Sequence, residues 1–111
     1  MKNKKIDIKL FALIILINFF IISNLFAEKP DYKLEAIKIL YKNNNDTVIA
    51  EGDAIAKDQF GKIISADKIL YFKSKGIIET FNNSKYEDSK GNTVLAQNFL
   101  YDINLKKLTA F

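Results

Sequence analysis

The sequence repeats itself with a period of thirty residues, so the chain is expected to fold as similar units placed side by side. One block begins with Ala and ends with Ile or Phe, then Leu and Tyr, and it occurs at residues 36–41, 66–71 and 96–101. Two further blocks keep the same period, at residues 48–51, 78–81 and 108–111 and at residues 58–61 and 88–91. Because the blocks share one register, the sequence predicts three copies of one unit, the third incomplete.

Each copy is predicted to consist of two β-strands and two turns. β-branched and aromatic residues cluster in short runs interleaved with polar residues, which is typical of strands. Residues 58–61 and 88–91 favour hairpin connections, since Asp can bond its own backbone and Gly can take a positive φ. Residues 42–46 and 73–76 supply the alternate turns. The predicted fold is therefore all-β, an open antiparallel β-jellyroll or meander.

Alternation of period two predicts which face of the sheet avoids water. The even positions from 48 to 56 are small or apolar, while Glu51, Asp53 and Lys57 point the other way. In the next strand Ile64 and Ala66 share one face and Ile69 and Tyr71 the other. A bulge near Asp67 or Lys68 would bring all four inward. A helix over residues 33–41 is the alternative for the first copy, because Leu34, Ile37 and Leu40 stand three apart, but register with the later copies favours strand.

The first 27 residues have the parts of a secretory signal peptide. Four lysines in residues 1–9 precede an apolar run at 10–22, and Ala27 offers a small residue for cleavage. An uncleaved membrane anchor is the alternative, although a span needs about 20 predominantly apolar residues. Either way, residues 28–111 are expected to form one domain beyond the inner membrane.

Composition excludes several classes of function. Without the leader, 13 lysines face 12 acids, so the net charge falls from +4 to +1, and the chain has no Arg. This gives no support for nucleic-acid binding. The chain also lacks Cys, His and Trp, which excludes Cys/His zinc sites and His-based catalysis. Carboxylate catalysis is the remaining option, and its candidates are Glu51, Asp53, Asp67 and Glu87. Ser23 and Ser65 lack an activating base. The chain is predicted to be no enzyme and to use no cofactor or metal.

The repeat resembles the OstA-like (organic-solvent-tolerance-like N-terminal) domain of lipopolysaccharide-transport proteins. That family alternates an Ala-Asp-x-Ile-x-Tyr strand with an x-Ala-x-Gly-Asn-Val strand, and residues 66–71 and 48–54 match these patterns. The likeness runs from Tyr32 to Phe111. The second copy departs from it with Asn82-Asn83 for Gly-Asn, and the third with Gln97 for Asp.

The resemblance implies a periplasmic β-jellyroll, associated in some members with the outer membrane, that carries lipopolysaccharide. Its acyl chains would lie in an apolar groove, whose expected lining is Val48, Ala50, Ala54, Ile64, Ala66, Ile69, Tyr71, Ile78, Val94, Ala96, Phe99 and Tyr101. Small residues such as Ala50, Ala54 and Ala66 would leave room for a chain. The alternatives are that these are ordinary core residues, and that the domain is an envelope adaptor that joins partners through strand edges.

The third copy stops in mid-repeat, which predicts an open sheet edge at Leu108, Ala110 and Phe111. This edge could receive a strand from another OstA-like domain by β-augmentation. Alternatively, the chain is a fragment of the outer-membrane lipopolysaccharide-assembly protein, and missing residues complete the domain. Association with a membrane would then come through partners or an uncleaved leader.

Overall fold

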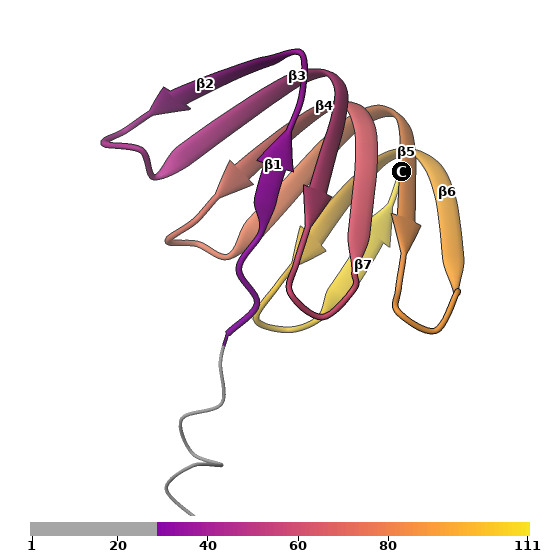
Figure 1. The fold of residues 1–111 in the computed structure, drawn as a ribbon. Helices are drawn as coiled ribbons and strands as arrows, with labels where there is room; N and C mark the ends of the chain where they lie inside the picture. The colour runs from indigo at the N-terminus through magenta and orange to yellow at the C-terminus, as the bar shows by residue number, and fades with distance from the viewer. Residues whose placement is uncertain (1–28) are drawn as a thin grey trace, which may run out of the picture.

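The computed structural model describes residues 29–111, which form one antiparallel sheet of seven strands and no helix (Figure 1). The strands are β1 (Lys33–Glu35), β2 (Lys38–Lys42), β3 (Thr47–Lys57), β4 (Ile63–Phe72), β5 (Ile77–Glu87), β6 (Thr93–Asp102) and β7 (Lys107–Ala110). The fold is the all-β open sheet that the repeat predicts. The predicted signal peptide lies outside the described residues.

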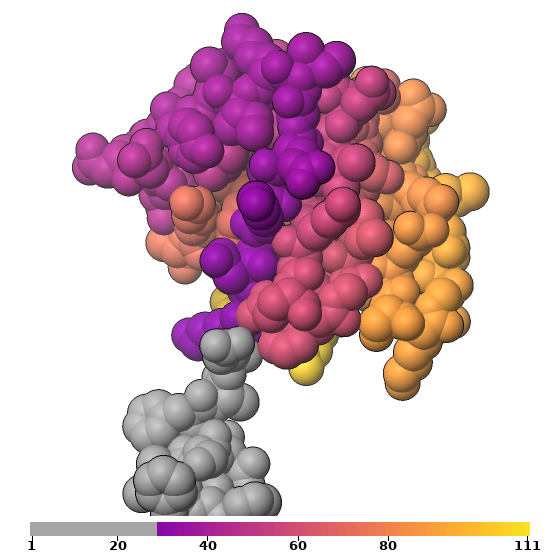
Figure 2. Space-filling view, viewed as in Figure 1, coloured from indigo at the N-terminus to yellow at the C-terminus, as the bar shows by residue number. Residues whose placement is uncertain are grey.

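The strands follow one another across the sheet in the order β1-β3-β4-β5-β6-β7, and β2 also pairs with β3. The first copy of the repeat therefore differs from the others, because its leading strand is divided in two. β1 pairs with the second half of β3, with Leu34 opposite Ala56. β2 pairs with the first half, with Ile39 opposite Ala50. In the space-filling view the copies succeed one another from indigo on the left to orange on the right (Figure 2).

A row of irregularities crosses the middle of the long strands. In the pairing of β3 with β4, Gly52 and Asp53 together face the single residue Asp67. In the pairing of β5 with β6, Asn82 and Asn83 together face Gln97. Gly52, Asp53, Asn82 and Asn83 all have positive φ values. An extra residue increases the local bend of a strand, and Figure 1 shows the long strands arching over at mid-length.

The bend divides the sheet into two layers whose inward faces meet. The first layer contains β2, residues 47–51, 68–72, 77–81 and 98–102 of β3 to β6, and β7. The second layer contains β1 and residues 54–57, 63–66, 84–87 and 93–96 of β3 to β6. The turns at 58–62 and 88–92 belong to the second layer, and those at 43–46, 73–76 and 103–106 to the first. The side opposite the bend is therefore lined by turns.

Large and small side chains alternate across the first layer. Directly paired residues on its inward face form the row Ile39, Ala50, Ile69, Thr80, Phe99 and Ala110. The Ala-x-x-Ile/Phe-Leu-Tyr block supplies the large residue of each pair, and the block at residues 48–51, 78–81 and 108–111 supplies the small one. Ala50 and Ile69 have no exposed surface and Phe99 has 2%. Such alternation lets the two layers interdigitate at the density of a protein interior.

Three expectations from the sequence are confirmed and one needs correction. The turns lie where they are predicted, and residues 33–41 contain strands instead of a helix. Ile64, Ala66, Ile69 and Tyr71 all face inward and are buried. However, the extra residues lie on β3 and β5, opposite Asp67, and not on β4 itself. Within residues 29–111, no helix is long and apolar enough to cross a membrane.

Candidate functional site

The twelve residues expected to line a groove all belong to the inward faces of the two layers. Ten of them are buried against their neighbours: Val48, Ala50, Ala54, Ile64, Ala66, Ile69, Tyr71, Ile78, Phe99 and Tyr101. Ala96 is half-buried, and Val94 is 38% exposed at the β6 end of the second layer. The structure thus brings nine of the twelve residues together into one apolar cluster, and Phe99, Val94 and Ala96 lie outside it.

The small residues of this interior lie beside the bend. Ala50 and Ala54 flank Gly52 and Asp53, and Ala54 pairs directly with Ala66. All three alanines are buried, Ala66 with 6% exposure as the largest value. In this structure they allow close packing where the strands arch over. That they make room for an acyl chain stays a prediction.

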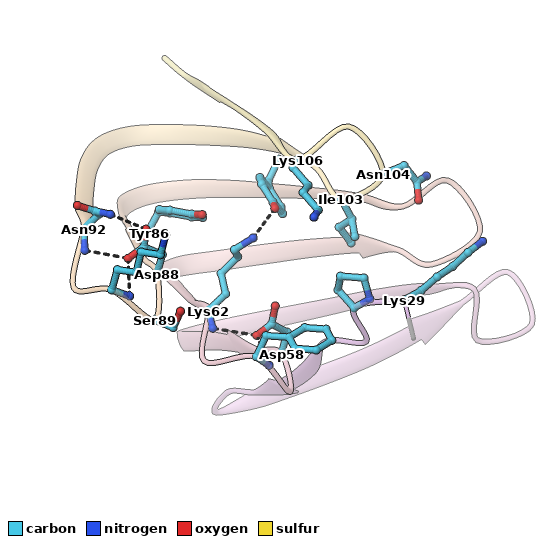
Figure 3. A pocket seen from close by; sticks show the side chains of 14 residues that line it. Lys29, Asp58, Lys62, Tyr86, Asp88, Ser89, Asn92, Ile103, Asn104 and Lys106 are labelled. Atoms are coloured by element: carbon cyan, nitrogen blue, oxygen red, sulfur yellow. Dashed lines mark hydrogen bonds between the residues drawn. The ribbon is translucent and has the colours of Figure 1, made fainter. Parts of the chain in front are cut away.

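Open space occurs instead on the side opposite the bend. A pocket of about 830 Å³ lies between the turns of the two layers and the segment that precedes β1 (Figure 3). Tyr86, Tyr101 and Ile103 give it an apolar floor, and four lysines and two aspartates are among its polar lining residues. Its volume falls in the range of about 300–1,000 Å³ that is usual for ligand sites. Of the twelve residues expected from the sequence, Tyr101 lines this pocket.

Lys62 spans the pocket from one layer to the other. Its backbone belongs to the turn between β3 and β4, where its N–H donates to Asp58 Oδ1 at 2.8 Å. Its Nζ donates to the hydroxyl of Tyr101, in the first layer, at 2.6 Å. The same Nζ lies 4.8 Å from the centre of the Tyr101 ring and 5.7 Å from that of Tyr86. Figure 3 shows the side chain extending between the layers.

The electrostatic surroundings keep Lys62 charged. Partial burial lowers its pKa, but the hydrogen bond with Tyr101 and the nearby Tyr101 and Tyr86 phenols outweigh this effect, so the pKa lies above its ordinary value. An ammonium over aromatic faces gains further cation–π stabilisation. Lys62 is therefore a fixed positive charge at neutral pH, held above an aromatic floor.

An aromatic cluster lies between the apolar interior and the pocket. The ring of Tyr32 packs edge-on against Tyr71 at 6.0 Å and Tyr101 at 6.5 Å, and Tyr86 lies 5.9 Å from Tyr101. Tyr32 is 5% exposed, and its hydroxyl has no hydrogen-bond partner. Burial is the main reason why the pKa values of Tyr32 and Tyr71 are raised. These tyrosine rings thus separate the buried interior from the pocket.

The expected carboxylates do not form a reactive pair. Glu51 lies 3.6 Å from Lys68, and Asp67 accepts a hydrogen bond from Asn83 at 3.1 Å. Glu87 Oε1 lies 3.0 Å from Nζ of Lys85, two residues earlier at the C-terminal end of β5. Asp53 is exposed at the bulge. In the part of the chain that the structure describes, no group of three acidic side chains could hold a metal ion.

The sheet ends in edges that carry exposed apolar side chains. Leu108 pairs with Tyr101 and packs against the core, while Ala110 and Phe111 are exposed, Phe111 by 69%. The Phe111 N–H donates to Asn98 O at 2.9 Å, so pairing continues to this residue. In the second layer the edge strand at this end is β6, where Leu95 is 72% exposed. At the opposite end of the sheet, Ile37, just before β2, is 81% exposed, and Tyr41, within β2, is 59% exposed.

The comparisons with known proteins add a likeness of fold. No protein-family model and no curated protein matches the sequence. Among solved structures, the chain is similar to LptH from Pseudomonas aeruginosa, described as the LptA-homologous periplasmic component of the conserved lipopolysaccharide transport device. The sequence identity is 12% and the TM-score 0.40, with 72% of this chain and 81% of LptH covered.

Sequence reasoning missed Lys62, Tyr86 and Ile103 because each has an ordinary neighbourhood along the chain. Lys62 follows a turn, where a lysine is usually a solvated surface residue. The spacing of the turns held a usable clue: equivalent turns thirty residues apart stack, so side chains at equivalent positions meet around one opening. Lys62 and Asn92 are such a pair, and both line the pocket.

Proposed function

We propose that this chain is a non-enzymatic component of lipopolysaccharide transport in the periplasm, and that its two sheet layers shelter the acyl chains of lipid A. The observation that supports this best is the single apolar interior between the layers, which reaches solvent at an aromatic-floored pocket. The repeat's resemblance to OstA-like domains points to the same function.

The energetics of hydrocarbon explain why such a module needs no catalytic group. Each exposed methylene costs about 0.8 kcal/mol in water, so a dozen cost close to 10 kcal/mol. Transfer into an apolar space removes that barrier. The pocket is where the layers already stand apart, and Tyr86, Tyr101 and Ile103 continue the interior outward. Deeper entry, toward Ile69 and Ile78, requires the layers to separate further, because these side chains are fully buried.

Site-specific photo-crosslinking in cells that export lipopolysaccharide tests this function. A benzoyl-phenylalanine at Tyr86 faces the pocket, and one at Ile69 probes the deeper interior. The matched control is Phe72, an aromatic residue on β4 whose neighbour Tyr71 carries the inward position. We expect lipid adducts from Tyr86, fewer from Ile69 and none from Phe72. Equal labelling at Phe72, or no lipid at either inward position, would remove the acyl-chain function.

A second candidate function is an envelope adaptor that joins partner domains through its edges. It is favoured by one observation, the exposed apolar residues Ile37 and Leu95 next to the two terminal edges of the sheet. Strand addition there would pair the β6 and β7 end of one domain with the β1 and β2 end of another OstA-like domain. The two functions are compatible, since such stacking would join the interiors of successive domains.

A further inference from the structure

Lysines from four separate segments converge on the pocket. Lys29 precedes β1, and the other three lie in the turns of both layers: Lys62, Lys90 and Lys106. Gln59 holds the first segment in place, because its side chain accepts from Asp31 N at 3.0 Å and donates to Lys29 O at 2.9 Å. The folding of the sheet therefore brings lysines that are distant in the sequence to the lining of one pocket, and Figure 3 labels Lys29, Lys62 and Lys106.

The two aspartates of the pocket serve the turns. Asp58 Oδ1 accepts the N–H groups of Phe60 and Lys62 at 2.9 and 2.8 Å. Asp88 Oδ1 likewise accepts the N–H groups of Lys90 and Asn92, both at 2.9 Å. Hydrogen bonds from Asn92 hold the pKa of Asp88 below its usual value. Four lysines against two aspartates leave a formal excess of two positive charges around the opening.

Lys62 has no carboxylate partner among residues 29–111, unlike Lys68 and Lys85, which each lie beside a glutamate. Its ammonium has three N–H donors, and the Tyr101 hydroxyl takes one of them. Even where Tyr86 takes a second, one N–H remains for a ligand. A phosphate group presents several oxygens at once and suits ammonium donors that reach it from different segments.

We propose that this pocket is the binding site for the phosphate headgroup of an anionic lipid, with Lys62 as the principal contact. The proposal rests on the proposed function, because the lipid's hydrocarbon would continue past Tyr101 and Ile103 into the space between the layers. The tyrosine rings beneath Lys62 favour an amphiphile over free phosphate. Lys29, Lys90 and Lys106 draw the headgroup to the opening.

Calorimetric titration of the protein, purified from the envelope of expressing cells, tests the site. The probes are decyl phosphate, uncharged decyl maltoside and inorganic phosphate, each below its micelle concentration where it forms micelles. The variants are Lys62→Gln, Lys62→Arg and, as a matched control, Lys85→Gln, which removes a lysine outside the pocket. Thermal unfolding of each variant verifies that it is folded.

We expect decyl phosphate to bind best, Lys62→Gln to weaken it about tenfold, and Lys62→Arg and Lys85→Gln to leave it within about twofold of wild type. Unchanged affinity in Lys62→Gln would overturn the headgroup site. Equal binding of decyl maltoside and decyl phosphate would overturn it too, but leave the acyl-chain function standing. Binding of inorganic phosphate as tight as that of decyl phosphate, and lost in Lys62→Gln, would show an anion site without a lipid function. No binding of any probe would overturn both proposals.

Discussion

The hydroxyl of Tyr32 is buried without a hydrogen-bond partner, which is unusual in a protein interior. Its ring nevertheless contacts Tyr71 and Tyr101. The ring therefore stabilises the domain, whereas burial of the hydroxyl removes its hydrogen bonds to water without replacing them.

Replacing Tyr32 with Phe should leave the free energy of unfolding unchanged or raise it by up to about 1 kcal/mol, since the packing is kept and an unsatisfied group is removed. Urea unfolding measures this. The comparison variant is Tyr101→Phe, which deletes the bond to Lys62 and should cost about 0.5–1.5 kcal/mol, toward the lower end because Lys62 is partly solvated. A loss above 1 kcal/mol in Tyr32→Phe would show that the hydroxyl does find a partner.

The buried tyrosines also predict how stability depends on alkaline pH. The pKa values of Tyr32 and Tyr71 are raised in the folded state, chiefly by burial. Above pH 10 the unfolded chain releases these protons while the folded chain keeps them, so stability falls as the pH rises. Below pH 10 both states hold the protons and these groups contribute no pH dependence.

Unfolding measured between pH 8 and 11.5 should show this loss, and Tyr32→Phe should make it shallower by up to about 1.4 kcal/mol per pH unit. Tyr41→Phe is the control, because that side chain is 59% exposed and its hydroxyl meets water in both states. Identical slopes for wild type and Tyr32→Phe would contradict the proposed burial effect.

Among the elements, β5 needs polar support at its bulge that β3 does not. A continuous chain of hydrogen bonds crosses the register shift between β5 and β6. Phe99 N–H donates to Thr80 Oγ1 at 2.9 Å, Thr80 donates to Ser84 Oγ at 2.7 Å, and Ser84 donates to Gln97 O at 2.9 Å. The equivalent residues thirty positions earlier are Ala50 and Ala54. The hydroxyls thus span the bulge and bond the carbonyl of Gln97, the residue opposite it.

Thr80→Val should therefore cost about 1–3 kcal/mol of unfolding free energy, because it keeps the side-chain volume and removes the buried hydroxyl that accepts from Phe99 N–H and donates to Ser84. Chemical denaturation provides the measurement. Thr93→Val, on the exposed start of β6, makes the same chemical change outside the network and should lie within about 0.5 kcal/mol of wild type. Equal effects of the two substitutions would argue against the role of the hydroxyl chain.

The bulge of β3 depends on Gly52 for two separable reasons. Its φ of +84° is disfavoured for a side chain, and an added Cβ would lie 2.9 Å from Ile37 Cδ1 and 3.0 Å from Ile37 Cβ. Gly91 has nearly the same φ, +85°, but no atom within 4 Å of an added Cβ. The two glycines form a matched pair that separates backbone strain from steric contact.

Gly91→Ala should lose about 1 kcal/mol through backbone strain alone. Gly52→Ala should lose more, and the additional loss should shrink when Ile37 is also shortened to Ala, because this removes Cδ1 at 2.9 Å and keeps Cβ at 3.0 Å. A double-mutant cycle on thermal or chemical unfolding gives both quantities. If Gly52→Ala and Gly91→Ala were equally destabilising, the contact with Ile37 would not limit the bulge.

At the scale of the whole molecule, the exposed edges predict self-association. Each layer ends in one strand at each side, and Leu95 is exposed on the β6 edge of the second layer. Charged residues on an edge strand disfavour strand addition. Leu95→Lys should therefore weaken association of the protein with itself by about tenfold, the value of one exposed leucine contact.

Sedimentation velocity over a range of concentrations measures this association. Leu105→Lys is the control, since Leu105 is 73% exposed, almost the same as Leu95, but lies in the turn between β6 and β7. A wild-type protein that stays monomeric at all concentrations, or equal effects of the two lysines, would contradict pairing through this edge.

Strands and turns were predictable because their determinants act within a few residues. Alternation sets the inward face, and Asp, Asn and Gly set the turns, so the period of thirty carries both from copy to copy. The similar environments of Tyr71 and Tyr101 also follow from this period. The two residues are thirty positions apart, both pair with Ile78 on β5, and both rings contact Tyr32. Tyr41 has the equivalent position in the repeat but is exposed, because β2 has no further strand beside it.

The bend and the pocket depend on contacts between residues far apart in the chain. The even-numbered positions from Val48 to Ala56 are small or apolar without a break, so the alternation itself does not locate a bulge at Gly52 and Asp53. The bulge becomes evident only because these two residues face the single residue Asp67 on the neighbouring strand. The arch then sets the two layers face to face and brings Lys62 to Tyr101, 39 residues later. The local sequence pattern thus determines which side chains of each strand are buried. Only the tertiary structure determines which side chains line the pocket, because the bend and the position of the two layers depend on the pairing of all the strands.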